Sequence, residues 1–165
     1  MTDFRTRTPD EVAELGGRLR ALDWSWQLAE IPDIAQRFGW RVVSTSEDDD
    51  WAMLDTGMGL ASGKVFADDG EVEKIQVSVS TIGPDTGETR TLVPQAYTAM
   101  AARLAATLGD PSAQITDDAP QVRWAGSDST LILAAPTRTI TLTLASNEWL
   151  ELFDEGSELS RQGQL

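Results

Sequence analysis

The sequence predicts an α+β protein built on a single antiparallel sheet, mixed at most, of about six to seven strands, with helices packed mainly on one face. Residues 72–81 and 138–145 alternate apolar and polar side chains, as half-buried strands do. No strand–helix–strand unit repeats along the chain, as it would in a parallel sheet. The length of 165 residues, 41% of them hydrophobic, is enough for one domain with its own core. We expect that domain to span residues 1–155 and a flexible tail to span residues 156–165.

The first helix is expected to begin after Thr8. Thr8, Pro9 and Glu11 form a capping-box pattern with proline at the first helical position. Gly16 and Gly17 inside this helix lower its intrinsic stability by roughly 1 kcal/mol each. They indicate either close packing against another backbone or a poor helix. The other helices are expected at residues 32–38, 94–108 and 147–155.

The strands lie in two groups along the chain. Asp68-Asp69-Gly70 predicts a hairpin turn, because Asp-Gly tolerates the positive φ angles that tight hairpins require. The two groups share an order of helix, glycine, tryptophan and paired strands around Trp51 and Trp124, which suits one sheet with helices on one face. The expected strands are residues 41–45, 51–55, 60–66, 72–81, 121–125, 130–135 and 138–145.

The composition excludes several kinds of chemistry. The 27 acidic and 13 basic residues give a net charge of −14, which repels nucleic acid and anionic membranes and speeds encounter with basic partners. Solubility is the alternative reason for such a charge. The chain has no cysteine for disulfides or thiolate metal sites and no histidine for acid–base catalysis or metal binding. With no signal-like start and no membrane-length apolar stretch, we expect a cytoplasmic protein without cofactor, metal or catalytic residues.

Asp-Thr-Gly occurs twice, beginning at Asp55 and at Asp85. Aspartic proteases need two such aspartates facing each other, so that they share one proton and activate a water. The second copy follows Gly83 and Pro84 in a loop, and the residue after the first copy is the bulky Met58. Since Asp-Thr-Gly is also a good turn sequence, we expect no aspartate dyad.

Two further motifs fail on their spacing. The run from Gly57 to Lys64 lacks the P-loop hydroxyl residue, because Val65 follows the lysine, and it leads into a strand. The acidic run from Glu47 to Asp50 lacks the glycine and glutamate of an EF-hand loop. These segments are therefore expected to be a glycine-rich hairpin and a solvated or partner-binding loop.

Acidic loops beside tryptophans are the best candidates for binding a partner. Four acidic residues precede Trp51, two more lie in the Asp68-Asp69 turn, and one of the tryptophans in Trp24-Ser25-Trp26 is expected to be exposed. Tryptophan is favoured at the centres of protein interfaces. The predicted partner-binding residues are Glu47, Asp48, Asp49, Asp50, Trp51, Asp68, Asp69 and Trp24.

Several short segments carry a resemblance to a family. They are Leu-Asp-Trp-Ser-Trp at 22–26, Phe-Gly-Trp at 38–40, Leu-Asp-Thr-Gly-Met-Gly-Leu at 54–60 with Gly63, and Leu-Gly at 108–109 ahead of Val-Arg-Trp at 122–124. In these segments the chain resembles small acidic actinobacterial proteins of unknown function. In size, acidity and helix-plus-sheet form it is also similar to immunity proteins, which block the active site of a toxin.

The leading hypothesis is a protein-binding module of immunity type. Its acidic loops would plug the basic cleft of a cognate toxin or secreted effector. A chaperone or adaptor for a secreted partner and an enzyme of unrecognised type are the alternatives. The oligomeric state is left open.

Overall fold

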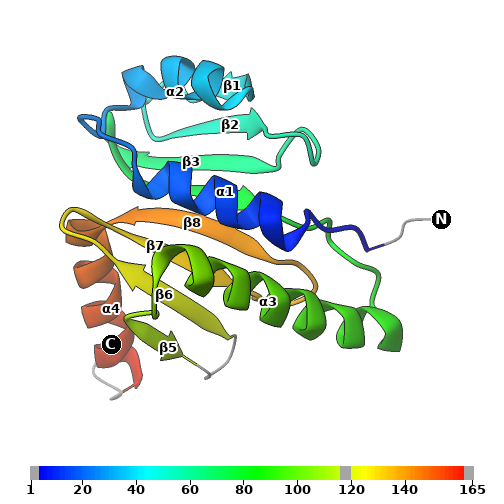
Figure 1. Ribbon diagram of the computed structural model, residues 1–165. Coiled ribbons are helices and arrows are strands. Elements are labelled where there is room, and N and C mark those ends of the chain that lie inside the picture. The colour runs from blue at the N-terminus through cyan, green and yellow to red at the C-terminus, as the bar shows by residue number, and fades with distance from the viewer. Residues whose placement is uncertain (1–3, 116–119, 162–165) are drawn as a thin grey trace.

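A computed structural model describes residues 4–115 and 120–161 of the chain. Eight strands form one sheet in the order β1-β2-β3-β4-β8-β7-β6-β5, and every neighbouring pair is antiparallel (Figure 1). The predicted antiparallel sheet is confirmed, but it has eight strands rather than six or seven. The strands are β1 (Arg41–Thr45), β2 (Trp51–Asp55), β3 (Gly63–Asp68), β4 (Glu71–Ser78), β5 (Ala113–Ile115), β6 (Gln121–Ala125), β7 (Ser129–Ala134) and β8 (Thr141–Ser146). The helices are α1 (Pro9–Arg20), a 3₁₀ turn (Leu28–Glu30), α2 (Ile31–Phe38), α3 (Gly87–Leu108) and α4 (Asn147–Arg161).

The sheet consists of two four-stranded meanders joined through β4 and β8. In each meander consecutive strands are neighbours, and the last strand of each pairs with the last strand of the other. The missed strand, β5, has three residues, and within residues 4–115 and 120–161 its strand partner is β6 alone. Three residues are too few for alternation to be recognised, so its existence depends on the neighbour that it pairs with.

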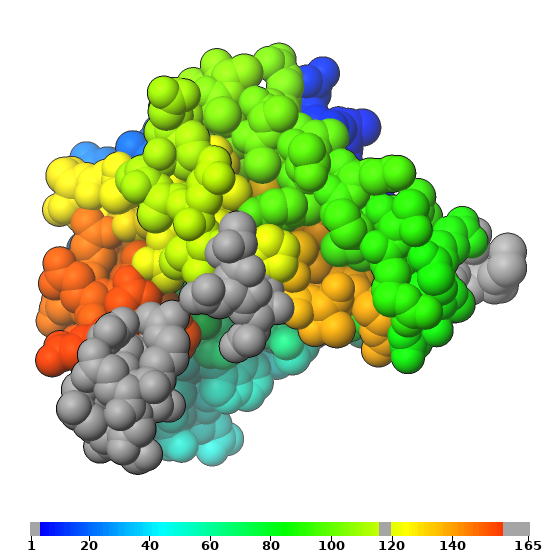
Figure 2. All heavy atoms as spheres, turned by 90° about the horizontal axis from the view of Figure 1, so that it is seen from below, coloured from blue at the N-terminus to red at the C-terminus, as the bar shows by residue number. Residues whose placement is uncertain are grey.

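Helices cover the two faces of the sheet unequally. Helices α1, α2 and α3 lie on one face, and α4 lies on the other, over the half of the sheet formed by the second meander (Figures 1 and 2). Two clusters of buried side chains fill the larger interface, one centred on α1, α3 and β6–β8 and one on α2 and β2–β4. Leu15 and Leu22 contact both clusters. The prediction that helices pack mainly on one face is therefore confirmed.

Helix α1 begins as its sequence predicts. The Thr8 hydroxyl accepts the Glu11 N–H at 3.1 Å, and the Glu11 carboxylate accepts the Thr8 N–H at 2.8 Å. The two glycines of α1 differ. A Cβ on Gly16 would lie 2.6 Å from Leu104 Cδ2 of α3, whereas a Cβ on Gly17 would meet nothing within 4 Å. Close packing against α3 therefore accounts for Gly16 only.

Some element boundaries differ from those predicted. Helix α3 begins at Gly87, capped by the Thr86 hydroxyl, and Pro94 lies inside it. The cap and the burial of Val93 outweigh the backbone hydrogen bond that proline cannot donate. Helix α4 continues to Arg161, past the predicted helix end at residue 155, and residues 162–165 of the predicted tail lie outside the described residues. No helix in the described ranges is both long enough and apolar enough to cross a membrane.

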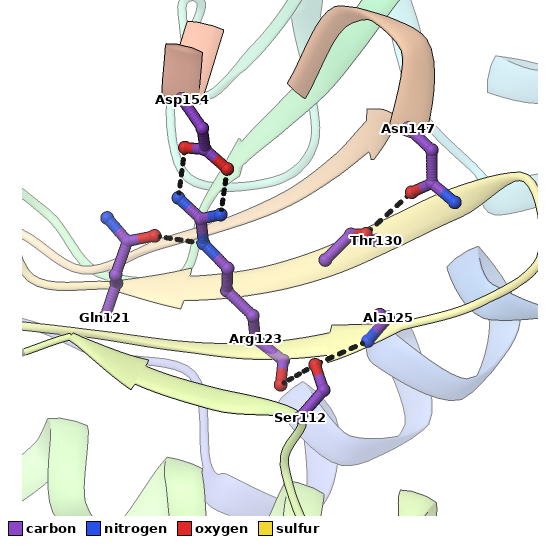
Figure 3. Close-up of polar contacts among 7 residues, drawn as sticks. All are labelled: Ser112, Gln121, Arg123, Ala125, Thr130, Asn147 and Asp154. Carbon is purple, nitrogen blue, oxygen red and sulfur yellow. Dashed lines mark hydrogen bonds and ion pairs between the residues drawn. The ribbon is translucent and has the colours of Figure 1, made fainter. Parts of the chain in front are cut away.

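Polar contacts hold α4 against the second meander (Figure 3). The Arg123 guanidinium on β6 donates to both oxygens of Asp154 on α4, at 2.7 and 3.0 Å, and to Gln121 Oε1 at 2.6 Å. At the start of α4, the Asn147 amide donates to the Gly126 carbonyl at 2.9 Å and accepts the Thr130 hydroxyl at 2.7 Å. The helix is thus fixed to the sheet at its first residue and at its middle.

Candidate functional site

The predicted acidic loops meet at one end of the sheet. The turns β1–β2 and β3–β4 lie at the same end, because alternate turns of a meander do, at the left of Figure 1. The Ala67 N–H donates to the Asp50 carbonyl at 2.7 Å, and the Gly70 N–H donates to the Asp49 carbonyl at 3.0 Å. The segments containing Asp48–Asp50 and Asp68-Asp69 are therefore in direct contact.

Local backbone chemistry shapes both turns. Asp69 and Gly70 have φ angles of 50° and 84°, which is the conformation that Asp-Gly hairpins favour. Asp49 also has a positive φ, 58°. The Ser46 hydroxyl accepts the N–H groups of Asp50 and Trp51 at 2.7 and 3.1 Å. The acidic side chains thus lie on turns whose backbone is held by hydrogen bonds.

The segment that follows α1 joins the same end of the sheet. The Val72 N–H donates to the Trp26 carbonyl and the Leu28 N–H to the Gly70 carbonyl, both at 2.8 Å. Trp24 and Trp26 contact each other, with ring centroids 4.9 Å apart, and both pack against the core of the first meander. Both are half-buried, so the expectation that one of them is exposed is wrong. Trp51, at the same end, is exposed, with 40% of its surface accessible to solvent.

The second meander adds acidic residues that the sequence patterns did not indicate. The β6–β7 turn contains Asp128, and α4 begins with Glu148 in its first turn. The Asn147 N–H donates to the Asp128 carbonyl at 3.0 Å, which brings these two residues to the same end. Asp128, Glu148 and Glu71 at the start of β4 are exposed. No local pattern distinguishes them, because their meeting depends on the pairing of β4 with β8.

We call this surface the acidic end; its exposed acidic residues are Glu47, Asp48, Asp49, Asp50, Asp68, Asp69, Glu71, Asp128 and Glu148. It is hollowed in two places. One hollow, of about 150 Å³, is lined by carboxylates together with Trp149 and Leu152. A second, of about 390 Å³, shares Glu71 and Glu148 with the first and reaches the tryptophans that follow α1. The two hollows adjoin at Glu71 and Glu148, and we call them together the acidic groove.

The charges in the groove repel one another. Removal from water raises the pKa of the Glu73 carboxyl, and the neighbouring Asp68 and Glu71 carboxylates raise it further, against the opposing Lys74 ammonium. Burial lowers the pKa of Lys74, with Glu73 opposing that shift. A carboxyl held in this way is stabilised by any cation that approaches it. The groove is therefore suited to positively charged side chains.

The two Asp-Thr-Gly aspartates have separate partners. Asp55, at the end of β2, lies 3.5 Å from Arg41 and accepts the Gly57 N–H at 2.9 Å. In the loop before α3, a carboxylate oxygen of Asp85 lies 2.9 Å from the Arg90 guanidinium. In the described part of the chain no hydrogen bond joins the two aspartates, as we expect of two turn sequences. The prediction that Asp55→Asn leaves activity unchanged stays a prediction.

The other rejected motifs also have structural roles. After Gly57 the chain turns and enters β3 rather than a helix, with positive φ angles at Gly57 and Gly59. The Thr56 carbonyl accepts a hydrogen bond from the Arg7 guanidinium. Among the residues that the structure describes, no three acidic side chains are grouped as a metal site requires.

A family model matches residues 10–146, from α1 to the last residue of β8. Its description is a family of unknown function, DUF6301. The chain belongs to this family. The predicted resemblance to proteins of unknown function is confirmed at this level. No curated protein and no solved structure matches the chain. The matched segment of DUF6301 contains the turns of both meanders and ends where α4 begins.

Proposed function

We propose that this protein binds a basic protein partner through the acidic end of its sheet. The observation that carries the proposal is the convergence of turns from both meanders, which gathers nine exposed carboxylates at one end of the sheet. A charge that served only solubility would have no reason to collect there, because spreading like charges over the surface lowers their mutual repulsion.

Such a surface favours rapid and selective encounter. A basic partner is attracted over about 8 Å at physiological ionic strength, and an acidic competitor is repelled. The turns are fixed by backbone hydrogen bonds, so little conformational entropy is lost when the partner docks. Affinity then depends on how many charges meet and on the apolar contacts beside them.

The specific form that we favour is an immunity-type inhibitor, which fills the basic active-site cleft of a cognate toxin in the cytoplasm. The fixed, projecting acidic turns have the shape and charge such a cleft would accept. A chaperone or adaptor that shields a secreted basic partner would use the same surface. The two forms differ in whether the bound partner is inhibited or kept ready for export.

The test compares two variants with the same change in charge. One is Asp48→Asn, Asp49→Asn and Asp50→Asn at the acidic end; asparagine tolerates the positive φ of residue 49. The control changes three exposed acidic residues elsewhere, Glu14→Gln, Asp85→Asn and Glu88→Gln. Surface changes of this kind shift stability by about 0.5 kcal/mol or less, so both variants should fold.

Each protein is used to capture partners from the native host, and association with a purified partner is then timed at low and high salt. We expect the acidic-end variant to associate about tenfold more slowly than the wild type at low salt, and the control to stay within about twofold. Capture of an inactivated toxic enzyme would favour the immunity form, and capture of an export substrate the chaperone form. Equal association rates for all three proteins would refute the proposal.

A further inference from the structure

An aromatic band crosses the face of the sheet that α1–α3 leave uncovered. Trp51 of β2 lies directly opposite Phe66 of β3, and Phe66 lies opposite Lys74 of β4. Residues opposite each other in antiparallel strands share a face. The Lys74 ammonium lies 4.7 Å from the ring centroid of Phe66 and 4.7 Å from that of Trp149 on α4, and Trp149 stacks on Phe153 at 5.0 Å.

This aromatic band, formed by Trp51, Phe66, Lys74, Trp149 and Phe153, is partly exposed. Trp51 has 40% of its surface exposed and Phe153 has 51%, and Leu152 beside the band has 65%. Clustered exposed apolar side chains of this size mark interaction surfaces in soluble proteins more often than isolated ones do. The exposed Leu60 and Ile82 lie in loops that leave the opposite end of the sheet and provide a comparison.

The band and the acidic groove share an edge. Trp149 and Leu152 line the same hollow as Asp68, Glu71 and Glu148. An apolar surface is thus bordered by carboxylates on the side that faces the acidic end. A ligand that covers both must be apolar along one side and cationic along the other.

We propose that the aromatic band is the docking surface for a basic amphipathic helix of the partner. This inference rests on the proposed function, since it names the part of a basic partner that this region binds. The apolar face of the helix would cover Trp51, Phe153 and Leu152, and its lysine or arginine side chains would enter the acidic groove. Lys74, which lies over the rings of both Phe66 and Trp149, already makes cation–π contacts within the band, so a cationic side chain is compatible with this surface.

Dimensions and charge both select this occupant. Strand spacing and the ring distances give the band a length of roughly 20 Å, which about thirteen residues of helix would cover. A second copy of this chain, with its net charge of −14, would bring two acidic ends together. Phosphates of nucleic acids or anionic lipids would be repelled for the same reason.

The test uses synthetic peptides as probes and isothermal titration calorimetry as the readout. One probe is an amphipathic helical peptide of about fourteen leucine and lysine residues. An oligolysine of equal charge reports charge attraction alone, and a leucine–glutamate peptide of the same pattern keeps the apolar face but reverses the charge. The variants are Trp51→Ala and Phe153→Ala, both at exposed positions, and the matched controls are Leu60→Ala and Ile82→Ala.

We expect the leucine–lysine peptide to bind at least about tenfold more tightly than oligolysine, and the leucine–glutamate peptide not to bind. Each band variant should lower the affinity for the leucine–lysine peptide about tenfold and leave the affinity for oligolysine unchanged. The control variants should change neither affinity. Circular dichroism melting curves verify that the variants are folded.

Two failures are distinguishable. If oligolysine and the leucine–lysine peptide bind equally, or the band variants have no effect, the docking surface is refuted while the proposed function stands. If neither cationic peptide binds, both proposals fail. Concentration-dependent dimerisation that Trp51→Ala abolishes would also overturn the inference, because the occupant would then be a second copy.

Discussion

Asp154→Asn should release α4 from the sheet without unfolding the rest of the protein. The Arg123 side chain is only 12% exposed and donates two hydrogen bonds to the Asp154 carboxylate, whose side chain is 47% exposed. Asparagine retains one oxygen but no charge, so it leaves a largely buried guanidinium without its counter-ion. The substitution thus removes the ion pair shown in Figure 3 by changing Asp154, the more exposed of its two partners.

The burial of the pair sets the size of the effect. Removing one partner of a fully buried ion pair costs about 3–5 kcal/mol, and exposed pairs contribute about 0–1 kcal/mol. Because Arg123 is buried and Asp154 is half-exposed, we expect a cost of about 2 kcal/mol. Among the side chains that the structure describes, Leu150, Trp149 and Asn147 make the other contacts of α4 with the sheet, so the cost should appear as local opening of the helix.

Hydrogen exchange measured by mass spectrometry gives the readout. A loss of about 2 kcal/mol corresponds to about thirtyfold faster exchange of α4 amides, with little change in β7 and β8. Asp85→Asn is the matched control, because the Arg90–Asp85 pair has a similar distance, 2.9 Å, but side chains 67% and 76% exposed. If the α4 amides exchange at the same rate in both variants, the Arg123–Asp154 pair does not hold α4 to the sheet and the reasoning is refuted.

Two further predictions concern stability. Gly17→Ala should stabilise the protein by about 1 kcal/mol, because alanine has a higher helix propensity and its Cβ meets no neighbour. Gly16→Ala should be about 2 kcal/mol less stable than Gly17→Ala, because its Cβ would lie too close to Leu104. Urea denaturation checks this, and a Gly16→Ala protein as stable as Gly17→Ala would contradict it. Glu73 has a raised pKa in the folded state, so the folded protein binds the proton of this carboxyl more tightly than the unfolded chain does. The free energy of unfolding therefore falls as the pH rises from the pKa of Glu73 in the unfolded chain to its pKa in the folded protein. Glu73→Gln should therefore melt at a higher temperature than the wild type at pH 7, with the difference vanishing below the ordinary glutamate pKa of 4.5; a difference that is the same at both pH values would count against this explanation.

The sequence alone determined the features that depend on neighbouring residues. The capping box at Thr8, the Asp69-Gly70 turn and the alternation of residues 72–79 are local, because a side chain there interacts with the backbone a few residues away. These signals were sufficient for the α+β class, the antiparallel sheet and the identity of most strands. They also identified the acidic turns, although not the end of the sheet at which both lie.

Only the tertiary structure decided how the two meanders combine. The pairing of β4 with β8 joins segments about seventy residues apart, and no local pattern specifies it. This pairing brings Glu71, Asp128 and Glu148 to the acidic end and places Trp149 beside Lys74. It also decides that α4 covers the face opposite α1–α3, where Thr141 and Thr143 are buried although their alternation predicted a solvated face. The reason is physical: strand order and the packing of a terminal helix are chosen by burial summed over the whole molecule, to which each residue contributes only a small part.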